Sequence, residues 1–213
     1  MGTKFVKYEQ IEKIAKITLN RPEAGNPLDV KLATDFLEIL ETMKSSDAIR
    51  AIVITGAGEC FSSGGDIGYL HKLVSRGGYL ECKHFLETLA KPVLMLRELR
   101  QPVLAAINGP AVGGGFDLML HCDIRVASED AKMGPIWVNN GVIPGLGAMQ
   151  LLPRLIGQGR ATEMILRGRK ITGKEAADIG LVHKAVPRIR LEREIMHIAE
   201  DIAGKPRLAI ECA

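Results

Sequence analysis

The feature that most constrains the fold is a glycine triplet, Gly113, Gly114 and Gly115, between an apolar run and a helical pattern. Residues 102–107 form a compact apolar run typical of a buried strand, and apolar residues continue after the triplet with helical spacing. Glycines at such a junction bring bare backbone N–H groups to a helix N-terminus, where they bind a phosphate or an oxyanion developing on a carbonyl. Asp117 follows one turn into the helix, where its carboxylate can reach the same space. The segment predicts a site without specifying its reaction.

A second glycine-rich loop follows another predicted strand. Residues 51–55 are a continuous apolar run typical of a parallel strand covered on both faces, and residues 60–67 follow it with two adjacent glycines. Loops after parallel strands meet at the carboxyl edge of a sheet, so we expect both glycine loops to converge on one ligand. Two N–H donors, each contributing ~3 kcal/mol, are what polarisation of a thioester carbonyl requires. A single glycine-rich loop indicates only a tight turn, whereas two such loops, each directly after a predicted strand, favour a binding site.

The rest of the chain alternates strand and helix patterns. We expect a hairpin over residues 5–19, a loop over 21–27 and a helix capped by Asp29. A long loop is expected over the glycines between 56 and 68, and a helix over 79–100 with a break or kink at Pro92. Strands are further expected at 123–127 and 181–186, a turn-rich loop at 142–147, and helices at 148–156, 158–166, 172–179 and 190–203. This alternation predicts an α/β fold with a mostly parallel sheet.

Composition excludes several classes of function. A net charge of +3 over 213 residues is too small to indicate nucleic-acid binding, and no apolar run reaches the roughly 18 residues of a membrane span. The four cysteines are far apart and the five histidines show no metal-ligand spacing, so we expect no metal site and no disulfide scaffold. Residues 1–12 carry no signal-peptide core, and the expected location is the cytoplasm.

Two nucleotide-binding motifs are incomplete. Residues 168–174 match the first seven positions of a P-loop, but Glu175 stands where a Ser or Thr hydroxyl would bind magnesium. The glycines after the strand at 51–55 begin a dinucleotide fingerprint whose third glycine is replaced by Phe61. Nucleotide hydrolysis and dinucleotide binding are therefore not predicted.

Six stretches of the chain together carry a resemblance to a known family. They are residues 20–22 with 26–28, 51–56, 61–67, 102–109, 113–115 with 122–123, and 143–145. With these stretches the chain resembles the crotonase superfamily, the enoyl-CoA hydratase/isomerase group, over essentially its full length. The resemblance implies a crotonase-like spiral of ββα units with flanking helices, an acyl-CoA substrate, and a homotrimer or dimer of trimers. It implies no separate cofactor, because coenzyme A is part of the substrate.

The resemblance also implies roles for individual residues. The backbone N–H groups of Gly65 and Gly114 would hold the thioester oxygen, and Asp117 would be the catalytic acid or base. The loop at 21–27 and the second glycine-rich loop would contact the substrate. The residues implied there are Arg21, Ala24, Asn26, Ser63, Gly64, Asp66 and Ile67.

The chain departs from the family pattern at its acids. Typical hydratases use two glutamates, of which the first corresponds to Asp117 and the second to Trp137, whose indole can only donate a hydrogen bond. A third acidic position, found in dienoyl-CoA isomerases, corresponds to Gly145. One acid remains of a possible three. A single acid suits double-bond isomerisation, or assistance to hydrolysis, decarboxylation or carbon–carbon cleavage, better than hydration by two carboxylates.

Alternatives remain open for two residues and for the chain as a whole. Asp117 is either the acid or base, or a first-turn acid favoured by the helix dipole. Trp137 is packed core, a trimer contact, or a substrate-binding floor of the acyl pocket. We expect one domain over 1–213 without the usual C-terminal helices of the family. The rival to an enzyme is a catalytically weak acyl-CoA-binding subunit.

Overall fold

The computed structural model describes residues 4–212, so residues 1–3 and residue 213, the ends of the expected domain, lie outside it. A six-stranded sheet with the order β1-β2-β4-β6-β8-β11 forms its centre. These strands are β1 (Val6–Ile11), β2 (Ile14–Leu19), β4 (Ala51–Gly56), β6 (Val103–Ile107), β8 (Ile124–Ser128) and β11 (Lys184–Val186). The expected hairpin, β1 with β2, is antiparallel, and the other neighbouring pairs are parallel. The α/β class with a mostly parallel sheet is confirmed.

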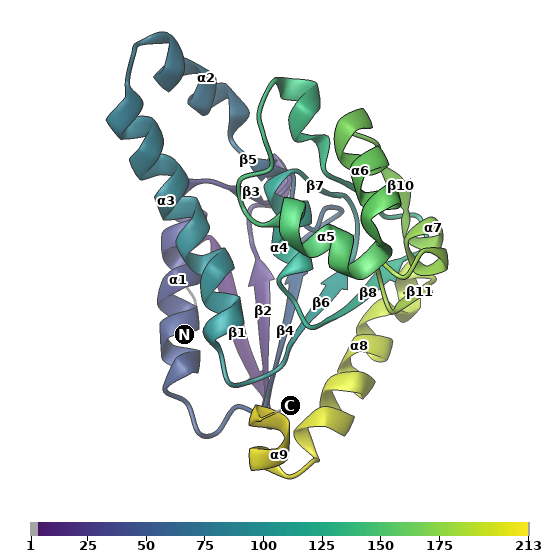
Figure 1. The fold of residues 1–213 in the computed structure, drawn as a ribbon. Helices are drawn as coiled ribbons and strands as arrows, with labels where there is room; N and C mark the ends of the chain where they lie inside the picture. The colour runs from purple at the N-terminus through teal and green to yellow at the C-terminus, as the bar shows by residue number, and fades with distance from the viewer. Residues whose placement is uncertain (1–3, 213) are drawn as a thin grey trace.

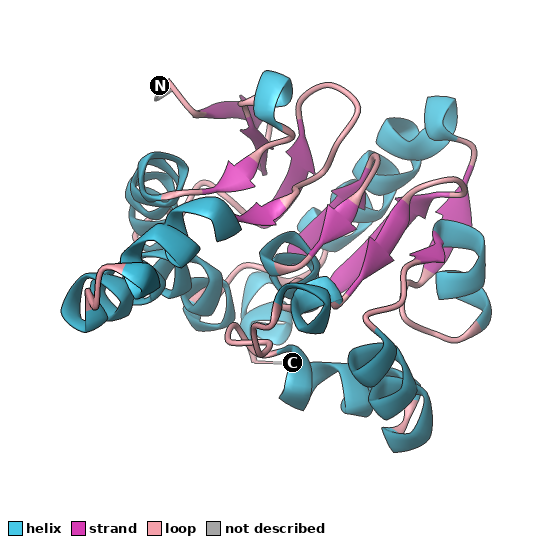
Figure 2. Cartoon of the chain, turned by 90° about the horizontal axis from the view of Figure 1, so that it is seen from above, coloured by secondary structure: helices cyan, strands magenta, loops and turns pink. Residues whose placement is uncertain are grey.

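Helices cover both faces of this sheet (Figures 1 and 2). On one face lie α1 (Val30–Lys44) and α3 (Tyr79–Met95), and on the other lies α8 (Arg188–Ala203). Along β4, Ile52 and Ile54 belong to the larger apolar cluster, whereas Ala51 and Val53 belong to the cluster under α8. Successive side chains of a strand point to opposite faces, so a strand covered on both sides must be apolar throughout.

Two small sheets lie at the carboxyl edge of the central sheet. One pairs β3 (Pro27–Leu28) with β5 (Gly64–Gly65), and the other has the order β10-β9-β7. The strands of the latter are β7 (Ala111–Val112), β9 (Lys132–Gly134) and β10 (Ile171–Thr172). Both sheets contain a strand from a glycine-rich loop, so they join the two loops to the body of the fold.

The remaining helices are α2 (Ile67–Ser75), α4 (Gly114–Leu120), α5 (Ala148–Ile156), α6 (Gln158–Arg167), α7 (Gly173–Asp178) and α9 (Arg207–Glu211), with 3-10 turns at Pro22–Ala24, Leu96–Glu98 and Ile136–Asn140. Of these helices, α5, α6 and α7 lie close to the expected boundaries, whereas α2 and α9 were not expected. Asp29 caps α1 as expected, because its Oδ1 accepts a hydrogen bond from the Leu32 N–H at 2.9 Å. Thr172 caps α7 in a reciprocal capping box with Glu175.

Three expectations about elements were wrong. The long glycine loop ends earlier, because Asp66 caps α2 and Gly68 lies inside that helix. Helix α3 is not broken at the buried Pro92, which lies inside it, and it ends at Met95 rather than at residue 100. The strand expected at 181–186 begins only at Lys184, because the N–H groups of residues 181 and 182 both donate to the Ala176 carbonyl in a turn after α7.

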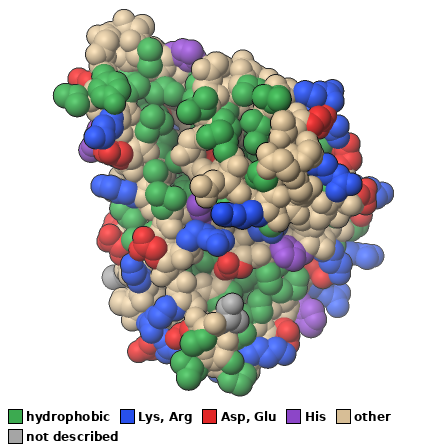
Figure 3. All heavy atoms as spheres, in the orientation of Figure 1, with side chains coloured by type: hydrophobic (Ala, Val, Ile, Leu, Met, Phe, Trp, Pro, Cys, Tyr) green, Lys and Arg blue, Asp and Glu red, His purple; other side chains and the backbone are tan. Residues whose placement is uncertain are grey.

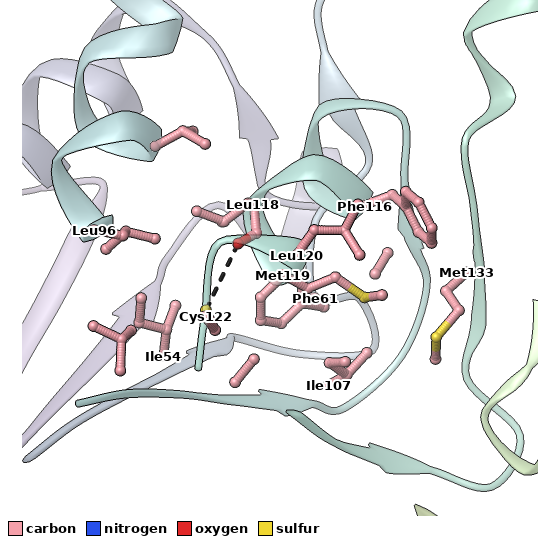
Figure 4. Close-up of a cluster of buried hydrophobic side chains, with 14 of the residues drawn as sticks. Ile54, Phe61, Leu96, Ile107, Phe116, Leu118, Met119, Leu120, Cys122 and Met133 are labelled. Carbon is pink, nitrogen blue, oxygen red and sulfur yellow. Dashed lines mark hydrogen bonds between the residues drawn. The ribbon is translucent and has the colours of Figure 1, made fainter. Parts of the chain in front are cut away.

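A dense apolar core lies beneath α4 (Figure 4). Phe61 and Phe116 are fully buried there, and the Cys122 Sγ donates to the Leu118 carbonyl at 3.6 Å. Burial raises the pKa of Cys122 to about 12, so this thiol is an inert core residue. Across residues 4–212, no helix combines the length and apolar character needed to cross a bilayer.

Candidate functional site

The two glycine-rich loops are hydrogen-bonded to each other. The Ser62 N–H donates to the Pro110 carbonyl, and the Val112 N–H donates to the Ser62 carbonyl, both at 3.1 Å. The buried Ser62 hydroxyl also donates to the Asn26 carbonyl at 2.8 Å. Backbone pairing of this kind brings the segments after β4 and β6 together, as expected from their place at the carboxyl edge of parallel strands.

Glycine is required at Gly64, where the two loops approach each other closely. Gly64 has φ of 84°, and a Cβ there would lie 2.6 Å from the Val112 carbonyl oxygen and 2.7 Å from the Gly114 nitrogen. A Cβ on Gly114 would lie 3.3 Å from the Gly65 nitrogen. The backbones of Gly65 and Gly114 are therefore immediate neighbours. Gly114 is also the first residue of α4, where the N–H has no acceptor within the helix.

Asp117 lies beneath this junction rather than at its surface. Its side chain is fully buried, its Oδ2 accepts from the Trp137 indole at 2.8 Å, and its Oδ1 accepts from the Ala148 N–H at 2.8 Å. Burial raises the pKa of Asp117 to about 7, against the lowering effect of the two hydrogen bonds. The carboxylate therefore links α4 to the turn that carries Trp137 and to the start of α5.

Trp137 forms a wall beside the glycines. Its indole N–H is taken by Asp117, and its ring edge lies 3.8 Å from the position of a Cβ on Gly113 and 4.0 Å from one on Gly65. Of the three alternatives for this residue, the packed core and the pocket floor both fit, because the side chain is 7% exposed. One edge of the Trp137 ring packs against the protein, and the other edge borders a cavity.

That cavity has a volume of about 320 Å³, at the small end of ligand pockets. Its wall is formed by Leu28, Gly65, Leu86, Glu87, Leu89, Ala90, Trp137, Val142, Ile143, Gly145 and Leu146. The lining is apolar except for one carboxylate, and it includes Gly65 and Trp137 but not Asp117. Figure 3 shows apolar side chains gathered on the upper part of the molecule, where α2, α3 and α5 lie. An apolar pocket that opens beside backbone N–H groups can hold an uncharged chain with a carbonyl at its base.

The loop at 21–27 uses two of its predicted site residues internally. The Arg21 guanidinium pairs with Asp29 and stacks over the Phe5 ring at 5.3 Å. Asn26 is fully buried, and its amide accepts from the Arg21 N–H and donates to the carbonyls of Ala57 and Cys60. A direct ligand contact by the Asn26 side chain is therefore not supported, because its polar atoms hold backbone groups of the two loops.

The other predicted contact residues lie nearer the surface. Ala24 is exposed, and its carbonyl accepts from the exposed Ser63 hydroxyl at 3.4 Å. Gly64 is buried at the junction, Asp66 is exposed and caps α2, and Ile67 is half-buried. Of these residues, Ala24 and Ser63 are hydrogen-bonded to each other, and Gly64 and Asp66 flank Gly65 in the chain.

Sequence reasoning missed the contribution of α3 to the pocket. Leu86, Leu89 and Ala90 follow the i, i+3, i+4 spacing of a helix face, and this spacing was the available signal. It could not reveal which cavity the face borders, because helix α3 is far in sequence from Trp137 and the loop at 142–147. For this reason Glu87 was not among the predicted site residues. Across residues 4–212, no group of three or more His, Cys, Asp or Glu residues could hold a metal ion.

Comparison with known proteins gives a consistent result. The sequence model of the family described as enoyl-CoA hydratase/isomerase matches residues 9–213. The chain is 42% identical over 207 residues to the probable enoyl-CoA hydratase echA12 of Mycobacterium bovis, covering 93% of this chain and 71% of that protein.

Solved structures are similar over nearly the whole chain. An enoyl-CoA hydratase from Bacillus anthracis superposes with a TM-score of 0.90 at 37% identity, covering 98% of this chain and 80% of the other. A monofunctional enoyl-CoA isomerase from M. smegmatis superposes with a TM-score of 0.82 at 35% identity, covering 99% of this chain and 90% of the other. Its relatives thus include proteins named for hydration and for isomerisation.

Proposed function

Because the chain belongs to the enoyl-CoA hydratase/isomerase family, we propose that it transforms an acyl-CoA thioester through an enolate held by the backbone N–H groups of Gly65 and Gly114. The observation that carries the proposal is the close approach of these two glycines, with a Cβ on Gly114 lying 3.3 Å from the Gly65 nitrogen, together with the place of Gly65 in the wall of an apolar pocket.

The proposed chemistry depends on charge that develops on the thioester oxygen. When a proton leaves the carbon next to the carbonyl, negative charge moves to this oxygen, and two preorganised N–H donors stabilise it. Each donor contributes ~3 kcal/mol to the transition state. The apolar lining strengthens both interactions, because a low local dielectric weakens electrostatic screening.

The contacts of Asp117 support a positioning role over the predicted role as acid or base. Both of its oxygens are hydrogen-bonded, and no part of its side chain is exposed to the pocket or to solvent. To exchange a proton with a substrate, Asp117 would have to release either Trp137 or Ala148. We propose that it instead holds Trp137 as the wall of the acyl pocket.

Of the family's reactions, double-bond isomerisation fits this site best. Hydration by two carboxylates needs an acid at both the Asp117 and the Trp137 position. Here the Asp117 carboxylate accepts a hydrogen bond from Trp137, and the Trp137 side chain is an indole instead of an acid. Isomerisation needs an enolate-stabilising site and one group that moves a proton from one carbon to another. Hydrolysis, decarboxylation and carbon–carbon cleavage remain alternatives on the same oxyanion site.

A second candidate is a catalytically weak subunit that binds acyl-CoA. The two hydrogen bonds of Asp117 favour this candidate, because the acid at the family position holds Trp137 and Ala148 in place. In either case the ligand is an acyl-CoA whose coenzyme A part is substrate and not a separate cofactor. We place the coenzyme A along Ala24, Ser63, Asp66 and Ile67, with Arg21 beneath it.

A mass-spectrometric time course with a panel of acyl-CoA thioesters tests the proposal. The panel contains 2-enoyl, 3-enoyl, cyclic dienoyl, aryl and malonyl-type thioesters, with the wild-type protein beside Asp117→Ala. We expect an unchanged mass with a moved double bond. A product heavier by one water would indicate hydration instead, and loss of CoA or carbon dioxide would indicate hydrolysis or decarboxylation. Binding without turnover of any thioester would support the second candidate.

A further inference from the structure

We infer that Glu87 on helix α3 is the catalytic carboxylate of this site, and that it moves the proton at the acyl chain in place of the buried Asp117. The inference rests on the proposed function, since it assigns a residue to the proton transfer that an enolate mechanism requires. Nothing in the sequence pattern of the family stretches points to this position.

The placement of Glu87 relative to the glycines carries the inference. Glu87 and Gly65 line the same cavity of about 320 Å³. Because Gly65 forms part of the cavity wall, an acyl group whose carbonyl oxygen meets the Gly65 N–H can extend into this small cavity. Its first carbons then lie within the space that the flexible Glu87 side chain borders, and reach of this kind is the first requirement of a general base.

Glu87 is also the sole ionisable side chain among the described residues that line the pocket. Beside it on α3, the apolar side chains of Leu86, Leu89 and Ala90 face the same cavity. The Glu87 side chain is 57% exposed, so its carboxylate borders the pocket at its solvent-facing side, and no other side chain of the lining offers a proton acceptor to a ligand there.

The local contacts leave the Glu87 carboxylate available. Its recorded ion pair is with Lys83, one helical turn earlier, at 3.8 Å, and the Glu87 side chain is 57% exposed. Ion pairs between exposed side chains contribute about 0 to 1 kcal/mol, so this one does not fix the carboxylate in place. Asp117, in contrast, is fully buried with both oxygens hydrogen-bonded.

The residues at the other two positions where the family has an acid cannot accept the proton. Trp137 borders the pocket, but its indole N–H is donated to Asp117. Gly145 borders the pocket as well and has no side chain. Among the lining residues, only helix α3 offers a group that accepts a proton.

The proposed proton transfer needs only the Glu87 carboxylate and the thioester, with no further reactant. The Glu87 carboxylate takes a proton from C2 of a 3-enoyl thioester, and the electron pair of the C–H bond forms a dienolate whose oxygen meets the N–H groups of Gly65 and Gly114. The carboxylic acid then returns the proton to C4. The double bond moves from C3–C4 to C2–C3, and Glu87 is regenerated.

Two measurements on the intact protein test the assignment. The first is the rate of isomerisation of a 3-enoyl-CoA, and the second is exchange of the C2 protons of a saturated acyl-CoA in deuterated water. Each is made for the wild type, Glu87→Gln, Glu87→Asp and the control Glu81→Gln, which removes a carboxylate from the same helix outside this pocket. Binding of the thioester is followed by the fluorescence of Trp137, the single tryptophan.

We expect Glu87→Gln to lower kcat and the exchange rate by about 10²- to 10⁴-fold, with thioester binding unchanged. Glu87→Asp restores part of the rate, and Glu81→Gln behaves as the wild type. Wild-type rates in Glu87→Gln would overturn this assignment and leave the proposed function intact. A wild-type protein that neither isomerises nor exchanges any thioester would overturn both.

Discussion

At Gly114 two stretches of backbone approach so closely that a single methyl group changes the site. A Cβ there would lie 3.2 Å from the Leu28 Cδ1 and 3.3 Å from the Gly65 nitrogen. Contacts this short require the neighbours to shift by a few tenths of an ångström. The fold can tolerate such a shift more easily than the alignment of two hydrogen-bond donors can.

For this reason Gly114→Ala should lower turnover more than stability. We expect kcat to fall by about 10²- to 10³-fold, the range seen when one donor to an oxyanion is lost. Turnover of the reactive thioester from the panel is measured beside the temperature of unfolding. The matched control is Gly159→Ala in α6, where a Cβ would meet nothing within 4 Å. Equal rates for both variants would contradict the role of Gly114.

Asp117 makes the free energy of unfolding depend on pH. Burial raises its pKa from 3.8 to about 7 in the folded protein, so the folded state binds this proton more tightly than the unfolded chain does. The resulting stabilisation is fully present below pH 4 and is lost as the pH rises through 7.

The difference in unfolding free energy between the wild type and Asp117→Asn should therefore decrease between pH 5 and pH 8, by on the order of 2 kcal/mol. Urea denaturation at several pH values measures it. Burial lowers the pKa of His121 and His183, so these two groups make the unfolding free energy change with pH in the opposite direction. Because the wild type and Asp117→Asn both contain them, their contribution cancels in the difference. A difference that does not change with pH would show that Asp117 keeps its ordinary pKa.

At the scale of elements, the site is formed by two loops that pack against each other and not by one motif alone. The segment after β4 and the segment after β6 are paired through Ser62 and Ala111, and α4 begins directly at this pairing. Gly115, the third glycine of the triplet, packs against the other loop, because a Cβ there would lie 2.4 Å from the Ser62 carbonyl oxygen and 2.6 Å from the Ser62 Cβ.

We therefore expect Gly115→Ala to destabilise the protein by about 1 to 3 kcal/mol through overpacking against Ser62. Gly159→Ala, a substitution of the same kind in open space within a helix, should instead stabilise it by up to about 1 kcal/mol. The midpoints of urea unfolding compare the two. If both variants moved the midpoint in the same direction, the two loops would not be packed as described.

At the scale of the whole molecule, several large apolar side chains remain exposed. Tyr79 and Leu80 at the start of α3 are 77% and 75% exposed, and Ile143 beside the pocket is 73% exposed. Contiguous apolar surface is typical of places that meet a partner, and Tyr79 and Leu80 are adjacent exposed apolar residues. They are compatible with the homotrimer or dimer of trimers that the resemblance implies, and the cytoplasmic location likewise stays a prediction.

Native mass spectrometry of the purified protein measures the number of subunits. We expect a species of three or six times the 23.1 kDa chain mass, which persists on dilution to micromolar concentration. A monomer at that concentration would contradict the prediction. Substitution of Leu80 by Ser would then help to locate the interface, because it removes an exposed apolar group without touching the pocket.

Much of the fold and part of the site were predictable because they depend on local pattern. Apolar runs specified β4 and β6, and the Asp29 and Thr172 caps specified where α1 and α7 begin. The two glycine-rich loops after strands indicated that they converge. The expectation for the long glycine loop failed because the Asp66 cap begins α2 before the exposed Gly68, and the break expected at Pro92 failed because this buried proline is accommodated within α3.

The sequence by itself determined the fold class, the family and the two glycine loops, because backbone chemistry at a glycine does not depend on distant side chains. Only the tertiary structure decided what Asp117 and Glu87 can do. One carboxylate is enclosed by Trp137 and Ala148, 20 and 31 residues away, and the other lines a cavity with residues from distant elements. Burial and the choice of partner set the chemistry of a carboxyl group, and both arise from contacts between segments that are far apart in the chain.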